Sequence, residues 1–483
     1  MKKTLIAPCL LILTACTLYQ KPEVPPLETP EEFKATVQVA NHHMENEWWK
    51  NFNDEQLNEL VSLALKKNYN YQIALKNIEI AQTYVSQNQS YLFPQVNSAF
   101  NSSRNKFVPV EFVGSTGGSG ALENSLNNTA PTTTSPLSGG IFNLQELAAS
   151  VTYEVDIWNQ IRNTVKQAQA NVVVSAADSN VVKLTLVSGV VNYYFQIMAL
   201  DINLDNLHKQ YRAAKEITEL EKVQYKSGLI DASAVYEAEI QEEGILSNIK
   251  NIEKQRQILE YTLAYLISEY PENFSIAPHH TLNTLPITHL IPAGIPAEML
   301  AMRPDIQAAY FQVLSYGYLE KQTIANFLPT ITLTADYGYA STALPQLLQS
   351  SSAFWNYGVG VSQFVFDYAI RMSEYERAKY QFESAILNYK NTVVNAYTEV
   401  NSALVSYKED NEALIALQAQ YKSSKELLGV ADAQYQAGLA DYSAYLTTDL
   451  SLLQTEYNVT NQQVLIIQDV IQVYKTLGLG LSD

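Results

Sequence analysis

Two stretches of the chain decide the fold: QYRAAKE with VQYKSGLIDASA from Gln210, and QYKSSKE with AQYQAGLADYSA from Gln420. Aligning residues 210–234 with 420–444 gives 11 identities in 25 positions at a constant offset of 210. A second match, VVNYYFQI against VVNAYTEV, has an offset of 203. The offsets differ by one heptad, so the copies keep the same coiled-coil face. A duplicated unit of this size predicts a pseudo-symmetric ring rather than a catalytic domain.

Both copies contain long stretches with a helical pattern. After Tyr445, apolar residues recur in alternating steps of four and three up to Tyr474, as in a heptad seam. The earlier copy has a weaker seam, which Arg256 interrupts. Proline-free stretches at about 157–226 and 369–436 precede the seams. A continuous helix of about 70 residues would reach roughly 100 Å, which suits a tube that crosses the periplasm.

Four segments alternate apolar and polar residues with a period of two. We expect these strands at about 95–103, 146–156, 330–340 and 356–366. Alternation over about 10 residues is typical of a transmembrane β-strand with lipid on one side and water on the other. The alternative is a small soluble sheet.

Four strands cannot close a barrel in lipid. Natural outer-membrane barrels have at least 8 strands, and an open edge would leave backbone groups unsatisfied. The chain must therefore share its barrel with copies of itself. Two copies would give 8 strands and three would give 12, and the strand count alone does not choose.

The first residues read as a lipoprotein signal. Residues 1–15 combine two lysines with a short apolar stretch, and Leu13-Thr14-Ala15-Cys16 forms a lipobox. We expect diacylglycerol and an N-acyl chain on Cys16, and Thr17 after it favours the outer membrane of a Gram-negative bacterium. The alternatives are an ordinary signal peptide with a chance cysteine or a short anchor, although a bilayer span needs about 20 apolar residues.

Composition narrows the class of function further. The formal charge of −18 argues against nucleic acid and anionic lipid as partners and is compatible with a lumen that favours cations. Once the signal leaves, the only cysteine is the lipidated one, so we expect no disulfide and no metal site. The six histidines lie in no zinc-binding or nucleophile motif. We therefore expect no cofactor and no enzymatic activity.

The repeats define the expected domains. Residues 16–270 form the first repeat, 271–296 a proline-rich equatorial linker, and 297–483 the second repeat. Pro94 and Pro329 stand where helix should change to strand. Residues 103–145 and 340–355 are expected to be extracellular loops. The Gly-rich run at 114–120 lacks the Lys and the helix of a phosphate loop.

Several motifs along nearly the whole mature chain resemble the outer-membrane efflux family, the TolC-like channels, and most closely its lipoprotein branch of multidrug efflux outlets (OprM/NodT type). They are Trp48-Trp49 with Phe52 and Asp54, then Tyr153 to Trp158 with Ile161-Arg162, then Ile295 to Leu300 with Arg303-Pro304-Asp305, and finally Tyr474 to Gly478. Two positions depart from the family: Asn159-Gln160 replaces a junction glycine, and 366–369 lacks a glycine pair.

The resemblance implies a homotrimer, with a 12-stranded barrel in the outer membrane and a helical coiled-coil tunnel in the periplasm. It further implies an inner-membrane pump and a periplasmic adaptor as partners. The adaptor would contact the helix tips, at Gly228, Leu229, Gly438 and Leu439. Simple helix capping explains the two glycines equally well.

The resemblance also places a gate just past the second tip. The candidate residues are Tyr435, Asp441, Ser443, Thr447 and Asp449. Some relatives carry aspartates at the positions of Ala444 and Thr447 and a leucine at that of Ser443. A ring of aspartates on a narrow axis would attract cations, whereas ordinary surface carboxylates are the alternative.

The expected function is an outer-membrane efflux channel that passively conducts drugs or other small molecules. A type I secretion outlet for polypeptides is a second possibility within the channel class. A copper or silver outlet is disfavoured because the six methionines form no cluster. Outside the class, a coiled-coil envelope spacer would share the lipid anchor and heptads but needs no paired strands.

Overall fold

The computed structural model describes residues 20–26, 30, 47–106, 141–277 and 303–480. Cys16 with its signal, most of the linker at 271–296 and much of the first expected loop lie outside these residues. The described chain forms two compact units. A sheet unit contains Ser86–Val165 and Lys321–Tyr375, and a helical unit contains Lys21–Val85, Lys166–Glu320 and Glu376–Asp483.

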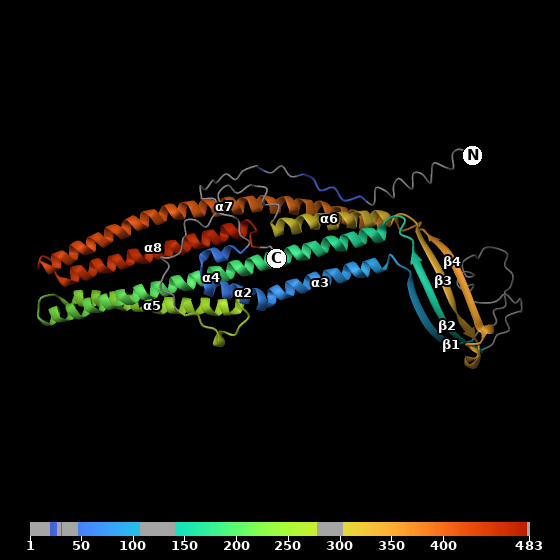
Figure 1. The fold of residues 1–483 in the computed structure, drawn as a ribbon, viewed down its shortest axis with the longest axis horizontal. Coiled ribbons are helices and arrows are strands. Elements are labelled where there is room, and N and C mark those ends of the chain that lie inside the picture. The colour runs from blue at the N-terminus through green and yellow to red at the C-terminus, as the bar shows by residue number, and fades with distance from the viewer. Residues whose placement is uncertain (1–19, 27–29, 31–46, 107–140, 278–302, 481–483) are drawn as a thin grey trace. The chain divides into compact units, whose positions relative to one another are not determined.

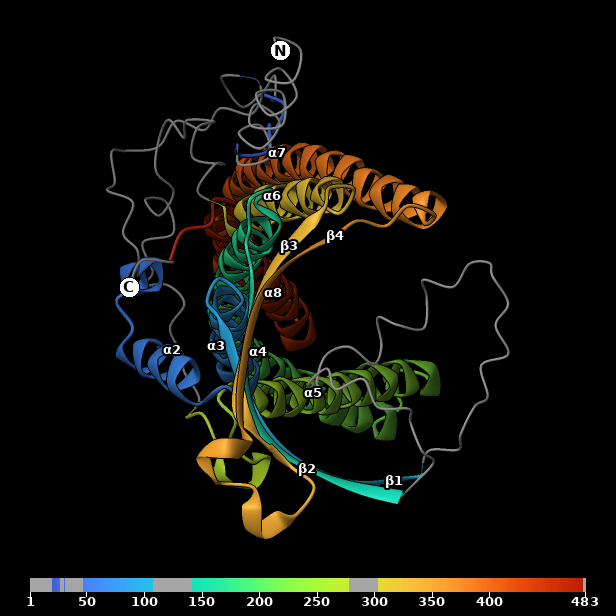
Figure 2. The same ribbon diagram turned by 90° about the vertical axis from the view of Figure 1, so that its right-hand side faces the viewer.

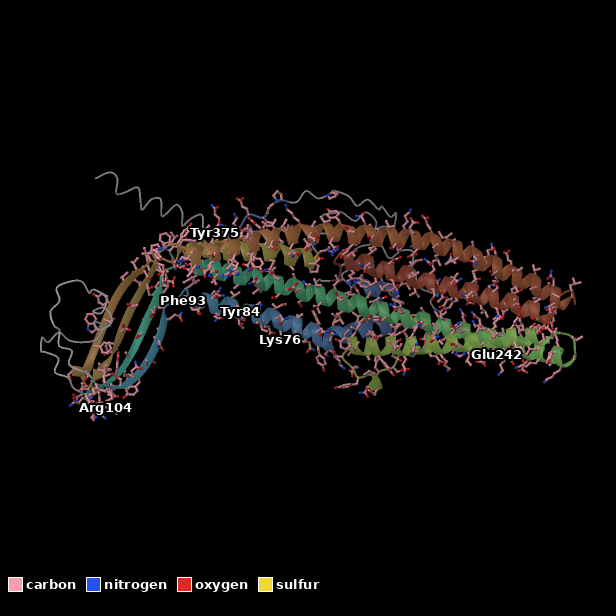
Figure 3. All side chains as sticks on the ribbon, turned by 180° about the vertical axis from the view of Figure 1, so that it is seen from behind. Lys76, Tyr84, Phe93, Arg104, Glu242 and Tyr375 are labelled. Carbon is pink, nitrogen blue, oxygen red and sulfur yellow. The ribbon has the colours of Figure 1, made fainter. Side chains whose placement is uncertain are left out.

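The sheet consists of four antiparallel strands that lie side by side in chain order (Figure 1). The strands are β1 (Gln95–Lys106), β2 (Ile141–Glu154), β3 (Thr330–Ser341) and β4 (Ala353–Ser362). Seen from its end, the sheet is curved (Figure 2). Along β1, Phe93 lies just before the start of the strand and Arg104 near its far end (Figure 3). β1 and β4 are the outer strands, and neither has a partner on its outer side within the sheet.

The pairing register separates the two faces of the sheet. One row across all four strands contains Val96, Val151, Ala335 and Tyr357. The next row, on the opposite face, contains Asn97, Ser150, Asp336 and Asn356. The apolar face is open: Val96 is 72% exposed and Tyr357 is 78% exposed. An exposed apolar face opposite a polar face is the pattern of a strand layer between lipid and water.

The strand ends differ from the sequence-based expectation. β2 begins at Ile141 rather than near 146, because the longer β1 pairs Lys106 with Ile141. β4 runs from Ala353 to Ser362 rather than over 356–366. Its last partner is Thr330, the first residue of β3, so residues 363–366 have no strand to pair with.

Long helices make up the rest of the fold. They are α2 (Glu55–Lys67), α3 (Tyr69–Ser90), α4 (Gln160–Lys226), α5 (Ala232–Leu266), α6 (Pro304–Ala325), α7 (Tyr368–Gln436) and α8 (Tyr442–Thr476). Single 3₁₀ turns occur at Trp48–Phe52, Pro271–Asn273, Leu344–Gln346 and Ser350–Ser352. The prediction of two very long helices is confirmed: α4 has 67 residues and α7 has 69, each roughly 100 Å long.

One helix among the described residues, α4, contains a window apolar enough to span a membrane by composition, and 56% of that window is buried inside the fold. A buried core helix passes the same composition test. The burial of α4 therefore agrees with a helix that packs against other helices.

In the main core of the helical unit, the segment that begins at Trp48 packs against the last helix, α8. Trp48 is fully buried and stacks on Tyr474 of α8, with ring centroids 5.0 Å apart. Tyr194 of α4 donates a hydrogen bond of 2.7 Å to Oδ2 of Asp54, which also caps α2. The Trp-Trp motif and the Tyr474 motif are thus two sides of one packed core.

Arg303 fastens the start of the second repeat. Its guanidinium pairs with Asp305 and with Glu399 of α7, both at 2.7 Å, and donates to the carbonyl of Thr476 at the end of α8. The Cα of Arg303 lies 3.3 Å from where a Cβ on Gly478 would stand. The Arg-Pro-Asp motif is therefore a structural clamp between three helices.

The joint between β2 and α4 is built by two local features. Asp156 accepts hydrogen bonds of 3.0 Å from the backbone N–H groups of Ile161 and Arg162, which caps the helix. Asn159 has φ of +60°, in the left-handed region that asparagine tolerates better than most residues. Asn159 thus has a left-handed conformation, which a glycine at this junction could also adopt.

Candidate functional site: the helix tips

The turn between α4 and α5 is a tight cap closed by glycine. Gly228 has φ of +75°, and its N–H donates to the carbonyl of Tyr225 at 2.9 Å. The N–H of Leu229 donates to Gln224 at 3.0 Å, which completes a Schellman motif. Asp231 then caps α5 by accepting from the N–H of Ser233.

The turn between α7 and α8 repeats this arrangement. Gly438 has φ of +69° and donates to Tyr435 at 2.9 Å, and Leu439 donates to Gln434 at 2.8 Å. Asp441 caps α8 by accepting from Ala444 N–H at 2.7 Å. The duplication seen in the sequence therefore extends to the hydrogen bonds of the two turns, which lie at the same end of the helical unit (Figure 1).

Each turn presents one large apolar side chain to the outside. Leu229 is 75% exposed and Leu439 is 81% exposed. A Cβ added to Gly228 or Gly438 would meet no atom within 4 Å. The turns therefore combine a fixed backbone with an open, apolar surface.

Behind the turns, the two helix pairs pack through a small apolar cluster. It consists of Ala213 and Ile217 of α4, Ala238 of α5, and Leu446 and Leu450 of α8. Tyr442 and Tyr445 pack on the edge of this cluster. The first residues of α8 are therefore held against the end of the first repeat.

Three tyrosines form an aromatic group at the second tip. The ring of Tyr435 lies 5.1 Å from that of Tyr442 and 6.2 Å from that of Tyr445, and the latter two are 5.8 Å apart. Burial and a hydrogen bond with Glu216 of α4 raise the pKa of Tyr442. The group thus links α7, α8 and α4.

The predicted gate residues occupy different environments. Asp441 is engaged as the helix cap. The hydroxyl of Thr447 donates to the carbonyl of Ser443 at 2.8 Å, so both belong to the first turns of α8. Asp449 is half-buried: burial raises the pKa of its carboxyl, and Lys209 of α4 acts in the opposite direction. The structure brings Tyr435 into the aromatic group, while the four α8 residues follow one another along the helix.

Sequence reasoning missed Tyr442, Tyr445 and Glu216. The alignment of the two repeats could have revealed the tyrosines. At the offset of 210, Tyr442 and Tyr445 correspond to Ala232 and Val235 of the first repeat. Small and aliphatic residues in one copy and tyrosines in the other mark the second tip as the specialised one.

Among the described residues, no group of three or more His, Cys, Asp or Glu side chains is arranged to hold a metal ion. The chemistry available at the tips is therefore apolar contact, hydrogen bonding by tyrosine and the charge of single carboxylates.

Comparison with known proteins identifies close similarity in both sequence and fold. The profile of the outer membrane efflux protein family matches residues 60–268 and 295–479. The chain is 23% identical over 478 residues to the cation efflux system protein CusC of Escherichia coli, covering 97% of both chains. It is 25% identical over 487 residues to the pyoverdine export outer membrane protein OpmQ of Pseudomonas aeruginosa, covering 99% of this chain and 96% of that one.

A solved structure has the same fold. The Campylobacter jejuni CmeC outer membrane channel superimposes with a TM-score of 0.80 at 23% identity, covering 96% of each chain.

Proposed function

The chain belongs to the outer membrane efflux protein family, and we propose that three copies of it form a lipid-anchored channel that conducts small molecules out of the cell. As a family member it is the outer-membrane channel of a tripartite efflux system, with a helical tunnel in the periplasm, and it is not an enzyme. The trimer, the lipid on Cys16, the gate and the cargo are the proposed parts.

The two-faced sheet carries the proposal. Its apolar face is exposed along all four strands, whereas its other face is polar, and its two outer strands lack partners within the sheet. In lipid every backbone N–H and C=O needs a partner, so β1 of one copy must pair with β4 of another. Three copies would give 12 strands, which exceeds the minimum of 8 for a barrel.

The helix tips support the rest of the proposal. Leu229 and Leu439 are the exposed apolar contacts offered to the periplasmic adaptor, and Gly228 and Gly438 let its backbone approach closely. The gate is formed by Tyr435, Asp441, Ser443, Thr447 and Asp449 near the second tip. The cargo class is drugs or other small molecules, delivered by an inner-membrane pump.

The test is the single-channel conductance of the purified oligomer in a planar bilayer, with the reversal potential under a salt gradient. The variant combines Asp441→Asn, Thr447→Ala and Asp449→Asn. Asparagine at 441 keeps the helix cap and removes only the charge. We expect a small, cation-selective conductance that rises in the variant, with weaker selectivity. An inserted, folded oligomer that conducts in neither form would refute the channel.

The cap is also tested alone: Asp441→Asn is compared with its control Asp231→Asn, which makes the same change in the cap of the first tip. The control should leave both conductance and selectivity unchanged if the gate belongs to the second tip alone. An equal effect of the two caps would place the restriction on both tips and would contradict the proposed gate.

A further inference from the structure

Residues 20–26 lie against the helices rather than apart from them. Lys21 Nζ donates to the hydroxyl of Tyr310 on α6 at 2.9 Å and lies 5.3 Å from the centre of its ring. Pro22 is buried, although prolines in connecting segments are usually exposed. Val24 packs against Leu314 and Tyr318, on the same helix. We call residues 20–26 the strap.

Gly317 of α6 is the point of closest approach. A Cβ built on this glycine would stand 2.7 Å from Cγ of Pro22 and closer still to its Cβ. It would also stand 3.0 Å from a ring carbon of Phe382 on α7. Carbon atoms do not approach this closely, and the proline ring cannot rotate away. Glycine is therefore required at this position for the strap to lie where it does.

The other close neighbour, Phe382, is the end of a side chain that can move, so Pro22 is the stricter reason for glycine at this position. In a helix interior glycine is less favourable than alanine by roughly 1 kcal/mol. Gly317 has no left-handed backbone conformation, unlike Gly228 or Gly438. The notch that it leaves between α6 and α7 is filled by Pro22.

Further contacts hold the strap on either side of the notch. Lys321 of α6 donates to the carbonyl of Gln20. The hydroxyl of Tyr397 on α7 donates to the carbonyl of Pro30 at 2.9 Å. The contact to Gln20 holds the start of the strap, and the contact to Pro30 holds the chain shortly beyond it, and both act through backbone carbonyls whatever the side chains.

The distance to the lipid follows from the chain length. Lys21 is the fifth residue after Cys16, and an extended chain covers at most about 3.6 Å per residue. A lipid on Cys16 therefore attaches within roughly 18 Å of the Lys21 backbone. A docked strap is a short brace, whereas a free segment would be a long, loose tether.

We propose that Gly317 and Tyr310 form a docking notch for the strap, so that the lipid anchor at Cys16 is braced directly on α6. The inference rests on the proposed lipidation for its role, but docking itself can be measured without it. The occupant of the notch is this chain's own Lys21-Pro22 segment.

The test uses a protease that cleaves after glutamate, applied to the purified full-length protein in detergent. Cleavage between Glu23 and Val24 is followed by mass spectrometry of the released peptide, which also reports whether Cys16 carries lipid. The variant is Gly317→Ala, and the control is Gly244→Ala on α5, where an added Cβ meets nothing within 4 Å. Both changes favour the helix, so neither should impair folding.

We expect Gly317→Ala to raise the cleavage rate at Glu23 by about tenfold or more, since cleavage of a briefly opened segment follows the open population. Gly244→Ala should match the unchanged protein. Tyr310→Phe, which keeps the ring and loses the bond to Lys21, should raise the rate by about threefold to tenfold.

Equal cleavage rates in all four proteins would overturn the docking notch. A released peptide without lipid, cleaved slowly in the unchanged protein and fast in Gly317→Ala, would support docking and reject the lipid anchor. A lipidated peptide that is released at the same rate from all four proteins would support the lipid anchor and reject docking. The two proposals therefore fail separately.

Discussion

Single residues fix the turns on which the long elements depend. Gly228 and Gly438 have left-handed backbone conformations at the two tips, and Asn159 has one at the joint between β2 and α4. A side chain with a Cβ costs roughly 1–2 kcal/mol in that conformation, and asparagine tolerates it better than most. Asparagine in place of the junction glycine is therefore compatible with the left-handed backbone at this joint.

The joint residue gives a direct comparison. Asn159→Ala should lower the free energy of unfolding by about 1 kcal/mol relative to Asn159→Gly, because only glycine adopts φ of +60° without strain. Both variants lose the contact between Asn159 and Arg162, so their difference isolates the backbone. Thermal unfolding followed by circular dichroism measures it. Equal free energies of unfolding for the two variants would mean that the backbone at this joint leaves the left-handed conformation.

A second residue makes stability depend on pH. Burial and the neighbouring Asp410 raise the pKa of Asp469 on α8 to about 7, and its Oδ2 has no hydrogen-bond partner in the described structure. The folded state thus holds a proton that the unfolded chain releases near pH 4. The contribution of Asp469 to stability is therefore greatest below pH 4 and is lost as pH rises towards 7.

Asp469→Asn should remove this dependence. Because the side chain is half-exposed and water screens its charge, we expect the free energy of unfolding at pH 8 to rise by about 1–2 kcal/mol. Urea unfolding at pH 5 and pH 8 measures it, and the variant should lose less stability than the unchanged protein between the two values. Asp449→Asn on the same helix serves as a comparison, and it should raise the free energy of unfolding at pH 8 by less than Asp469→Asn does. A parallel pH profile for Asp469→Asn and the unchanged protein would contradict the assignment.

Helices and strands were predictable to different degrees. The two proline-free stretches that precede the heptad seams predicted α4 and α7 nearly to their ends, because a helix is interrupted by local signals such as proline. The ends of β2 and β4 were displaced by several residues, because Lys106 and Thr330 set them by pairing across the sheet. The tyrosine group was missed for the same reason, since Glu216 reaches Tyr442 only once α4 and α8 are packed.

The contact between Glu216 of α4 and Tyr442 of α8 should help to hold the second tip closed. Tyr442→Phe keeps the aromatic stack but loses the hydrogen bond to Glu216, which is worth about 0.5–1.5 kcal/mol at this solvent-accessible position. We expect a rise of about twofold to tenfold in the ratio of open to closed channel, derived from the single-channel open probability. Tyr445→Phe leaves the Glu216 bond intact and should have little effect. A similar rise in both variants would assign the effect to the rings.

At the scale of the whole molecule, the chain supplies only part of a closed structure. The sheet leaves two strand edges without partners, and its apolar face is suited to lipid. Trp355 and Tyr357 of β4 are 69% and 78% exposed and stack on each other. Exposed aromatic residues of this kind are enriched where a barrel meets the membrane surface. In the proposed channel, further copies of the chain close the barrel.

The number of copies is the last quantity to measure. Native mass spectrometry of the detergent-extracted protein should give three times the mass of one mature, lipidated chain, corresponding to 12 strands. A mass of two chains would mean an 8-stranded barrel, whose interior is largely filled by side chains. Such a barrel could not conduct drug-sized molecules, so a dimer would refute the proposed cargo as well as the trimer. Three chains leave a wider interior, which is what an efflux channel requires.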